Sequence, residues 1–561
     1  MSKALIECVP NFSEGRDEAV IEAIAGAIRS VEGVSLLNVD PGQATNRTVY
    51  TFVGEPEPVC EAAFRAARKG IESIDMARHH GEHPRFGAVD VCPLVPISGI
   101  SMEETADYAR QLGKHMGDEL GITIFLYEQA ASSEGRRNLA EVRAGEYEGL
   151  AEKLRNPEWK PDFGPSAFNA RSGATAVGAR DFLVAYNVNL NTTSTRRANA
   201  IAFDVREKGR AKRIGDLLTG EIMRDEQGEP IYNPGTLQSV KAIGWFIEEY
   251  GIAQISMNLT NISVTPVHIA FDEVVEKAAA RGIRVTGSEL VGLIPLKAML
   301  DAGRYFLRKQ KRSLGVSDKE LIKIAIHSLG LTDLAPFNPE ERIIEYAIQD
   351  RTRKLLVDRT LRDFIEETAS ESPAPGGGSI SATLGALGAA LATMVANLSS
   401  HKRGWDDRWE EFSDWAVKGQ TYVAELTALV DEDTDAFNAL MAAFGMPKGS
   451  DEEKAARSAA IQAATRGAIE VPLRVMRATV ASMEVIHAMV ETGNPNSVTD
   501  AAVGALCARS AVMGAFLNVR INAGGLEDKA FVDAALAEGR RLQDEAQAKE
   551  AEILAIVERN L

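Results

Sequence analysis

Cysteine is scarce in this chain, with four among 561 residues, at positions 8, 60, 92 and 507. They lie far apart and form no CxxC pair, so the sequence predicts neither a disulfide framework nor a bound metal. Such usage is typical of a reducing compartment, and we expect a cytoplasmic location. Glu7 interrupts the N-terminal apolar residues early, so we expect no export signal.

The chain also lacks an excess of positive charge. Its 62 Lys and Arg residues against 80 Asp and Glu residues give a formal net charge of −18. Nucleic acids and anionic membrane surfaces bind positive faces, so we expect neither as a partner. An anionic small substrate would need a locally basic pocket. The length predicts about three to five domains at roughly 100–200 residues each.

Long, strongly hydrophobic runs are missing as well. The nearest candidate is the uncharged stretch 372–400, in which one helix could cover Ser379 to Leu398. It is rich in Ala, Gly, Ser and Thr, and is less apolar than the ~20 hydrophobic residues that a bilayer requires. A closely packed bundle helix is therefore favoured over a membrane helix.

The first half of the chain alternates between strand and helix patterns. Strands are predicted at 4–9, 34–39, 48–53, 88–95, 123–127, 182–189, 239–246, 252–259 and 283–290. Helices are predicted at 17–31, 58–74, 102–120, 195–208 and 266–281. The segment 161–180 is dense in Gly and Pro and is predicted to be a loop. This alternation is typical of α/β sandwiches, in which helices lie on a sheet.

The predicted fold class is α/β, as two α/β-sandwich subdomains, followed by an all-α helical domain. The subdomains are assigned to residues 1–181 and 182–332, with a linker at 333–360. From about Leu361 alanine becomes abundant, proline becomes rare, and long helical periodicities dominate. Residues 361–561 are therefore assigned to the helical domain.

The densest titratable cluster is HHGEHPRFG at 79–87, with three of the eight histidines. Histidine is the side chain best suited to proton transfer near neutral pH. His83 is a candidate, and the following Pro84 restricts its backbone. A solvated polar loop explains the same residues, and the spacing disfavours zinc.

Two further segments of the first half are candidate binding sites. In the loop 164–173, glycines permit close backbone approach and Arg171 supplies a positive charge, although most such loops are connectors. Asn187, Asn189 and Asn191 recur with period two, which would place three amides on one strand face. They could bind a pterin-like edge or form an ordinary polar sheet face.

In the helical part, one carboxylate interrupts an apolar stripe. Positions 426, 430, 433, 437, 440 and 444 follow helical spacing, and all are apolar except Asp433. Burial of Asp433 would cost free energy and raise its pKa, which suits a proton-transfer role. The alternative is an exposed, capping Asp in the acidic cluster 431–435. The segment 372–379 (SPAPGGGS) could hold a polar ligand at the start of the next helix.

Six segments of the first half resemble the glutamate formiminotransferase family. They are CVPNFSEG (8–15), TNRTVYTFVG (45–54), GEHPR (81–85), DVCP (90–93), RAGEYE (143–148) and DFGPSAF (162–168). The resemblance implies transfer of the formimino group from N-formimino-L-glutamate to N5 of tetrahydrofolate, with His83 as the catalytic histidine. It also implies that a loop binds the folate substrate, comprising Gly164, Pro165, Ser166, Ala167, Phe168, Asn169, Ala170, Arg171, Ser172 and Gly173.

The helical part is similar to the formiminotetrahydrofolate cyclodeaminases. The matching segments are APGGGS (374–379), LVDEDTDAFN (429–438) and GAFLNVRIN (514–522). The resemblance implies that Asp433 is the catalytic acid when N10 closes onto the formimino carbon, giving 5,10-methenyltetrahydrofolate and ammonia. Cyclohydrolases acting on methenyltetrahydrofolate share these features.

The order of the two motif sets resembles the bifunctional formiminotransferase-cyclodeaminases of histidine breakdown. This implies polyglutamated tetrahydrofolate as co-substrate and a homo-oligomeric assembly. Two alternatives stay open. One is a formylglutamate-using transferase with a methenyltetrahydrofolate cyclohydrolase-like C-terminal domain. The other is a non-catalytic folate-binding scaffold oligomer.

Overall fold

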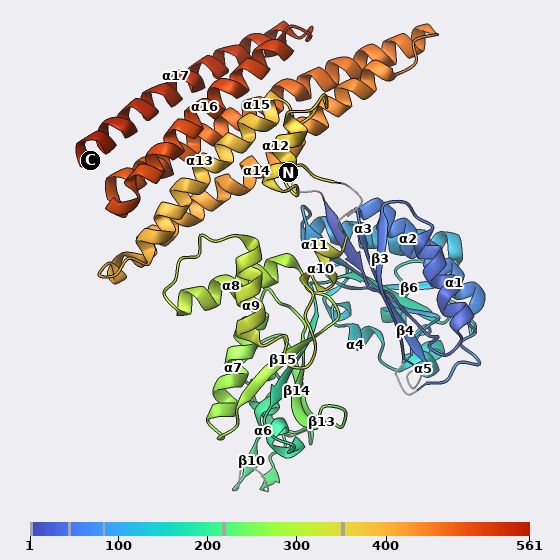
Figure 1. Cartoon of the computed structure of the whole chain (residues 1–561). Helices are drawn as coiled ribbons and strands as arrows, with labels where there is room; N and C mark the ends of the chain where they lie inside the picture. The colour runs from blue at the N-terminus through green and yellow to red at the C-terminus, as the bar shows by residue number, and fades with distance from the viewer. Residues whose placement is uncertain (1–3, 43–45, 82–84, 216–219, 349–353) are drawn as a thin grey trace. The chain divides into compact units, whose positions relative to one another are not determined.

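The computed structural model describes residues 4–42, 46–81, 85–215, 220–348 and 354–561. The chain divides into two compact units, formed by residues 1–302 with 326–349 and by residues 303–325 with 350–561. The first unit contains two α/β subdomains and the second is helical (Figure 1). The predicted fold class is therefore confirmed. The predicted domain boundaries stay a prediction.

The first subdomain is built on a seven-stranded mixed sheet. In chain order its strands are β1 (Leu5–Cys8), β2 (Asn11–Phe12), β3 (Val34–Gly42), β4 (Arg47–Gly54), β5 (Val89–Ser98), β6 (Thr123–Glu128) and β7 (Ala174–Ala179). The spatial order is β1-β4-β2-β5-β7-β6, with β3 paired to β4. Helices α1 (Glu18–Arg29), α2 (Pro56–Ser73) and α3 (Met102–Leu120) share one core with the sheet.

The two faces of this sheet have different roles. On β6, Ile124 and Leu126 belong to the core under the helices, whereas Phe125 and Tyr127 belong to a second cluster on the other face. This follows from the alternation of side chains along a strand. The second face carries the short helices α4 (Leu139–Val142) and α5 (Glu146–Lys153).

Strand β7 corrects the prediction that residues 161–180 form a loop. It pairs in parallel with both β5 and β6, and all six of its residues are buried. A strand buried on both faces shows no polar alternation. Because its sequence, ATAVGA, consists of small residues, its composition resembles that of the loop before it.

The second subdomain is an antiparallel sheet in the order β13-β14-β8-β15. Its strands are β8 (Val184–Leu190), β13 (Val240–Ile247), β14 (Ile252–Leu259) and β15 (Val285–Val291). Helices α6 (Thr195–Val205) and α7 (Val267–Ala279) pack against it. Two small ribbons pair β9 (Arg210–Ala211) with β12 (Tyr232–Asn233), and β10 (Arg213–Ile214) with β11 (Glu221–Ile222). Helices α8 (Leu296–Lys309), α9 (Asp318–Leu329), α10 (Pro339–Arg342) and α11 (Ile344–Ala347) follow.

The helical unit is a bundle of long helices. They are α12 (Leu361–Thr368), α13 (Gly377–Ser400), α14 (Trp409–Gly445), α15 (Asp451–Thr492), α16 (Val498–Ala523) and α17 (Lys529–Asn560). By length and composition, α13 and the segment Pro495–Ala523 could cross a membrane, and 56% and 50% of their most apolar windows are buried inside the protein. A core helix of a bundle meets the same criteria, so this is weak evidence for a membrane span.

Helix α13 packs against α14, α15 and α16, and its small residues make this possible. A Cβ atom added to Gly388 would lie 2.8 Å from the carbonyl oxygen of Gly504 in α16. One added to Gly385 would lie 2.6 Å from Oγ1 of Thr479 in α15. The abundance of Gly, Ala and Ser in this helix therefore reflects close approach of helix backbones.

Two glycine-to-alanine variants test this packing. Gly388→Ala should lower the free energy of unfolding by about 1–3 kcal/mol, because the new methyl group meets backbone atoms. Gly467 of α15 has nothing within 4 Å of its missing Cβ, so Gly467→Ala should raise that free energy by roughly 0.5–1 kcal/mol through helix propensity. Urea unfolding followed by circular dichroism measures both. Shifts of the same sign would contradict the packing argument.

Candidate active sites

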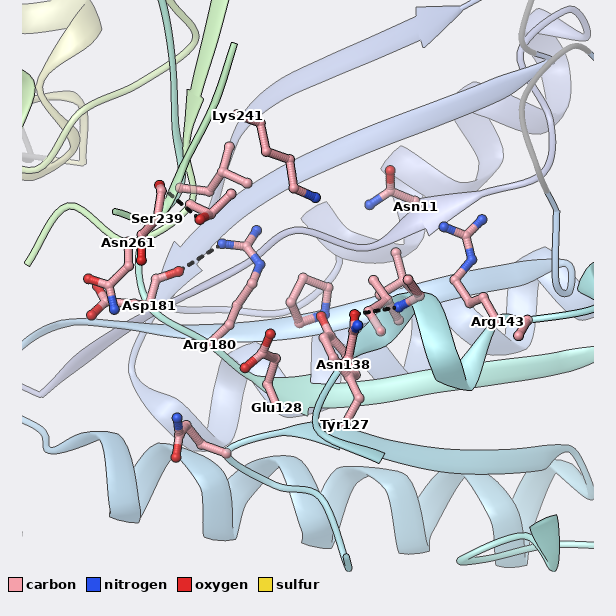
Figure 2. Close-up of a pocket in the computed structure, with 18 of the residues that line it drawn as sticks. Asn11, Tyr127, Glu128, Asn138, Arg143, Arg180, Asp181, Ser239, Lys241 and Asn261 are labelled. Carbon is pink, nitrogen blue, oxygen red and sulfur yellow. Dashed lines mark hydrogen bonds between the residues drawn. The ribbon is translucent and has the colours of Figure 1, made fainter. Parts of the chain in front are cut away.

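The first candidate site is a cavity of about 940 Å³ lined by residues of both α/β subdomains. Its walls include Val91 and Tyr127 of the second sheet face and Met102 at the start of α3. Figure 2 shows polar side chains from both subdomains gathered around it. They include Asn11, Tyr127, Glu128, Asn138, Arg143, Arg180, Asp181, Ser239, Lys241 and Asn261.

Local structure explains how Arg143 reaches this cavity. It directly follows the single turn of α4, whose N-cap Asn138 accepts a hydrogen bond from Ala140 N at 3.0 Å. Lys153 Nζ donates to the carbonyl oxygens of Glu141 and Val142 at 2.8 and 2.6 Å. Burial lowers the pKa of Lys153 to about 8. The loop that carries Arg143 is thus tied to α5 by hydrogen bonds from one amine.

A buried carboxylate binds two arginines beside the cavity. Asp90 has no exposed side-chain surface, and its Oδ2 accepts from Arg143 Nη2 at 2.9 Å and also pairs with Arg47. Asn11 Oδ1 accepts from Arg47 Nε at 3.0 Å. Burial lowers the pKa of Arg47, and the charge of Asp90 opposes that effect. The three ionised side chains carry one net positive charge, which suits an anionic ligand.

A second group of charges lies around Arg180. Glu7 of β1 is buried, and burial raises its pKa to about 7 while the charge of Arg180 opposes this shift. Burial also raises the pKa of Tyr127. Arg180 Nη1 donates to the carbonyl oxygen of Asp181 at 3.0 Å (Figure 2). Glu7 and Arg180 were not singled out from the sequence as site residues, although a lone Glu within an apolar strand was a signal for the first.

The predicted catalytic residue His83 lies outside the described residues, as does Pro84. The chain on either side is well anchored. His79 Nε2 is 2.7 Å from the carbonyl oxygen of Asn46, and burial lowers the pKa of His79. Arg85 forms a salt bridge with Glu148 at 2.5 Å and donates to the carbonyl oxygen of Met76 at 3.2 Å. The role of His83 stays a prediction.

The predicted folate-binding loop 164–173 begins and ends with structurally required glycines. Both have positive φ, and an added Cβ would lie 1.9 Å from Ile122 O at Gly164 and 2.4 Å from Phe86 O at Gly173. Residues 164–171 are exposed. No residue of the loop is among those that the structure describes as lining the 940 Å³ cavity. The binding role of the loop stays a prediction.

The three predicted amides do not form one open row. Asn189 Nδ2 donates to Asp333 at 3.0 Å, and its Oδ1 accepts from Gln254 at 2.8 Å. Asn187 Nδ2 donates to Glu289 at 3.2 Å. Asn191 lies beyond the end of β8, where its Oδ1 accepts from the backbone N–H of Arg284 at 2.8 Å. This arrangement favours the polar sheet face over a pterin site.

The second candidate site is a cavity of about 120 Å³ inside the helical unit. It is lined by the turn before α13, by the first turn of α13 and by residues of α14, α15 and α16. They are Pro373, Ala374, Gly376, Gly377, Gly378, Asp433, Thr434, Ala436, Phe437, Leu440, Ala468, Asn518 and Asn522. Asp433 lies far inside α14, which begins at Trp409, so the alternative of a helix-capping Asp is wrong.

Asp433 is held by the first turn of α13. The buried hydroxyl of Ser379 donates to Asp433 Oδ2 at 3.0 Å. Burial raises the pKa of Asp433, and hydrogen bonds from the Ser379 side chain and backbone partly oppose this. A Cβ at Gly378 would lie 2.0 Å from Asp433 Oδ1, so only glycine leaves room for the carboxyl group. Ser379 belongs to the sequence motif 374–379, but its contact with Asp433 depends on the tertiary structure.

Three family models match consecutive parts of the chain. They are the formiminotransferase domain N-terminal subdomain at 5–180, the formiminotransferase domain at 185–349 and the formiminotransferase-cyclodeaminase model at 360–541. A formimidoyltransferase-cyclodeaminase of Gallus gallus is 44% identical over 99% of both chains. A glutamate formimidoyltransferase of Streptococcus pyogenes serotype M1 is 40% identical over 54% of this chain and 93% of its own.

A methenyltetrahydrofolate cyclohydrolase of Methylorubrum extorquens is 39% identical over 34% of this chain and 92% of its own.

The two α/β subdomains, the helical unit and their separate cavities define a two-part enzyme, with a transferase region followed by a cyclodeaminase region. The chain belongs to the formimidoyltransferase-cyclodeaminase family. The resemblance inferred from the sequence is confirmed.

The arginine pair around Asp90 gives a stability prediction for the first unit. Asp90→Asn should lower the free energy of unfolding by about 3–5 kcal/mol, because two largely buried guanidinium groups lose their shared carboxylate. The control is Asp107→Asn, which breaks an exposed pair with Arg110 and should change stability by less than ~0.5 kcal/mol. Urea unfolding compares the two. Equal, small effects would mean that the buried cluster does not stabilise the fold.

Proposed function

We propose that the chain catalyses two successive reactions of histidine degradation. The first transfers the formimino group from N-formimino-L-glutamate to N5 of tetrahydrofolate. The second cyclises and deaminates 5-formiminotetrahydrofolate to 5,10-methenyltetrahydrofolate and ammonia. The observation that carries this proposal is the similarity over 99% of both chains to a formimidoyltransferase-cyclodeaminase. A separate cavity in each unit is consistent with one site for each reaction.

For the transfer step we assign His83 as the catalytic histidine. N5 loses a proton as it attacks the amidine carbon, and the departing glutamate nitrogen gains one, so a single imidazole serves both steps. The 940 Å³ cavity is large enough for substrates of this size. Arg143, paired with Asp90, supplies positive charge for a substrate carboxylate. The loop 164–173 is assigned to folate binding.

For the second step we assign Asp433 as the acid. Attack of N10 on the formimino carbon displaces the former imino nitrogen, which needs a proton to leave as ammonia. Burial raises the pKa of Asp433 and so favours the neutral form that can donate this proton. Ser379 holds the carboxyl group in place through its hydroxyl hydrogen bond.

One assay tests both assignments. N-formimino-L-glutamate and tetrahydrofolate are supplied to wild type, His83→Ala and Asp433→Asn, and methenyltetrahydrofolate and ammonia are followed. His83→Ala should abolish both products, because proton transfer to and from nitrogen is lost. Asp433→Asn should accumulate 5-formiminotetrahydrofolate with a loss of ~10²–10⁴-fold in the second step, the usual contribution of a general acid.

The same assay separates the alternatives. A wild-type chain that makes neither product would favour a formylglutamate substrate or a non-catalytic folate-binding scaffold. Hydrolysis of methenyltetrahydrofolate without ammonia release would favour a cyclohydrolase-like C-terminal domain, the name that one relative of this region carries. Turnover by His83→Ala at the wild-type rate would contradict the assignment of that residue.

We further propose that the folate co-substrate is polyglutamated and stays bound between the two steps. The tail adds carboxylates that basic residues can hold. Polyglutamated tetrahydrofolate should therefore give less 5-formiminotetrahydrofolate in bulk solution than the monoglutamate. Equal rates and equal release with both forms would contradict this.

Three remaining proposals come from the sequence. The chain is a homo-oligomer, joined through helical faces, and sedimentation velocity of the full chain measures its mass.

The protein acts in the cytoplasm. This location agrees with the four free cysteines in the structure and is checked by cell fractionation. The two proposed steps make and break C–N bonds with acid–base catalysis by side chains. Activity should therefore survive treatment with a metal chelator.

A further inference from the structure

Two asparagines of α16 line the cavity beside Asp433, and the orientation of each amide is determined. Asn518 Nδ2 donates to the carbonyl oxygen of Gly514 at 2.9 Å, and Asn522 Nδ2 donates to that of Ala468 at 2.8 Å. A backbone carbonyl can only accept, so the NH₂ group of each amide must face it. Neither Oδ1 accepts a hydrogen bond from another of the described residues, which leaves both oxygens as acceptors.

The described residues that form the walls of this cavity carry no positive charge. Among the described residues that line it, Asp433 is the one ionisable side chain, and Lys, Arg and His are absent. The two asparagines are four positions apart, so they share one face of α16. The cavity therefore offers carboxyl and amide oxygens to a group that has N–H donors.

The amide of Asn518 and the carboxyl group of Asp433 converge on one turn of backbone. A Cβ at Gly377 would lie 3.1 Å from Asn518 Nδ2, and one at the adjacent Gly378 would lie 2.0 Å from Asp433 Oδ1. The two glycines leave room for both polar groups at the start of α13. Asp433 and Asn518 therefore both lie at the start of α13, on the walls of the same cavity.

We propose that Asn518, supported by Asn522, selects a formimino group over a formyl group at this site. The inference rests on the proposed function and identifies the chemical group of the substrate that this site recognises. A formimino group on N5 is an amidine, which has N–H donors and is protonated near neutral pH. A formyl group has only a carbonyl oxygen there. An amide oxygen accepts a hydrogen bond from the formimino group and repels the oxygen of the formyl group. The discrimination is strong because a formyl group would leave buried polar atoms without hydrogen-bond partners.

The test uses the full chain and two ligands. Ammonia release from 5-formiminotetrahydrofolate gives kcat/KM, and its inhibition by 5-formyltetrahydrofolate gives a Ki. Asn518→Leu should lower kcat/KM by ~10–100-fold, as expected for the loss of one hydrogen bond to a charged group. The Ki should stay the same or fall, because leucine removes the oxygen that repels the formyl oxygen.

The matched control is Asn438→Leu, since Asn438 is exposed on α14. It should leave both constants unchanged. An equal loss for both ligands in Asn518→Leu would mean that the residue has only a structural role, and no loss for either would also overturn the proposal. A wild-type chain that releases no ammonia would instead contradict the proposed function itself.

A second variant covers the case in which Asn518→Leu fails to fold. Asn518→Asp keeps the acceptor oxygens and gives up the hydrogen bond to Gly514. It should keep or increase the preference for the formimino ligand, measured as the ratio of Ki to KM. If that ratio falls by ~10-fold, the acceptor is not what selects the substrate, and the proposal is wrong.

Discussion

Close approach of backbones at positions without a Cβ is the constraint on which the helical unit depends. Gly388 lets α13 reach the backbone of α16, and Gly378 admits the carboxyl group of Asp433 at the start of the same helix. One helix rich in small residues thus provides both the packing of the bundle and one wall of its cavity. Substitutions that perturb its packing are therefore expected to perturb the site as well.

Each candidate site holds a carboxyl group that is fully or largely removed from water, and the two differ in the groups that pair with it. Asp90 binds two arginines, so its negative charge is balanced and the cluster has an excess of positive charge. Asp433 accepts hydrogen bonds from the side chain and backbone of Ser379, and burial raises its pKa. The first arrangement suits binding of an anion, and the second suits donation of a proton.

Regular periodic segments were predictable, and segments without periodicity were not. The helix predicted at 102–120 has the bounds of α3, and in the structure the capping box of Ser101 and Glu104 sets its start. The sequence predicts a loop where β7 lies, because a strand buried on both faces does not alternate. The two-residue strands β9 to β12 are too short to have any periodicity.

The family, the two-part order of the chain and the candidates His83 and Asp433 follow from the sequence alone, because contiguous motifs and helical spacing are local properties. The fold is needed to show that Ser379 and Gly378 meet Asp433, that Asn518 presents an acceptor, and that Asp90 joins Arg47 to Arg143. These contacts connect positions that are distant in the chain. The hydrogen bonds and charges that set their chemistry arise when packing removes them from water.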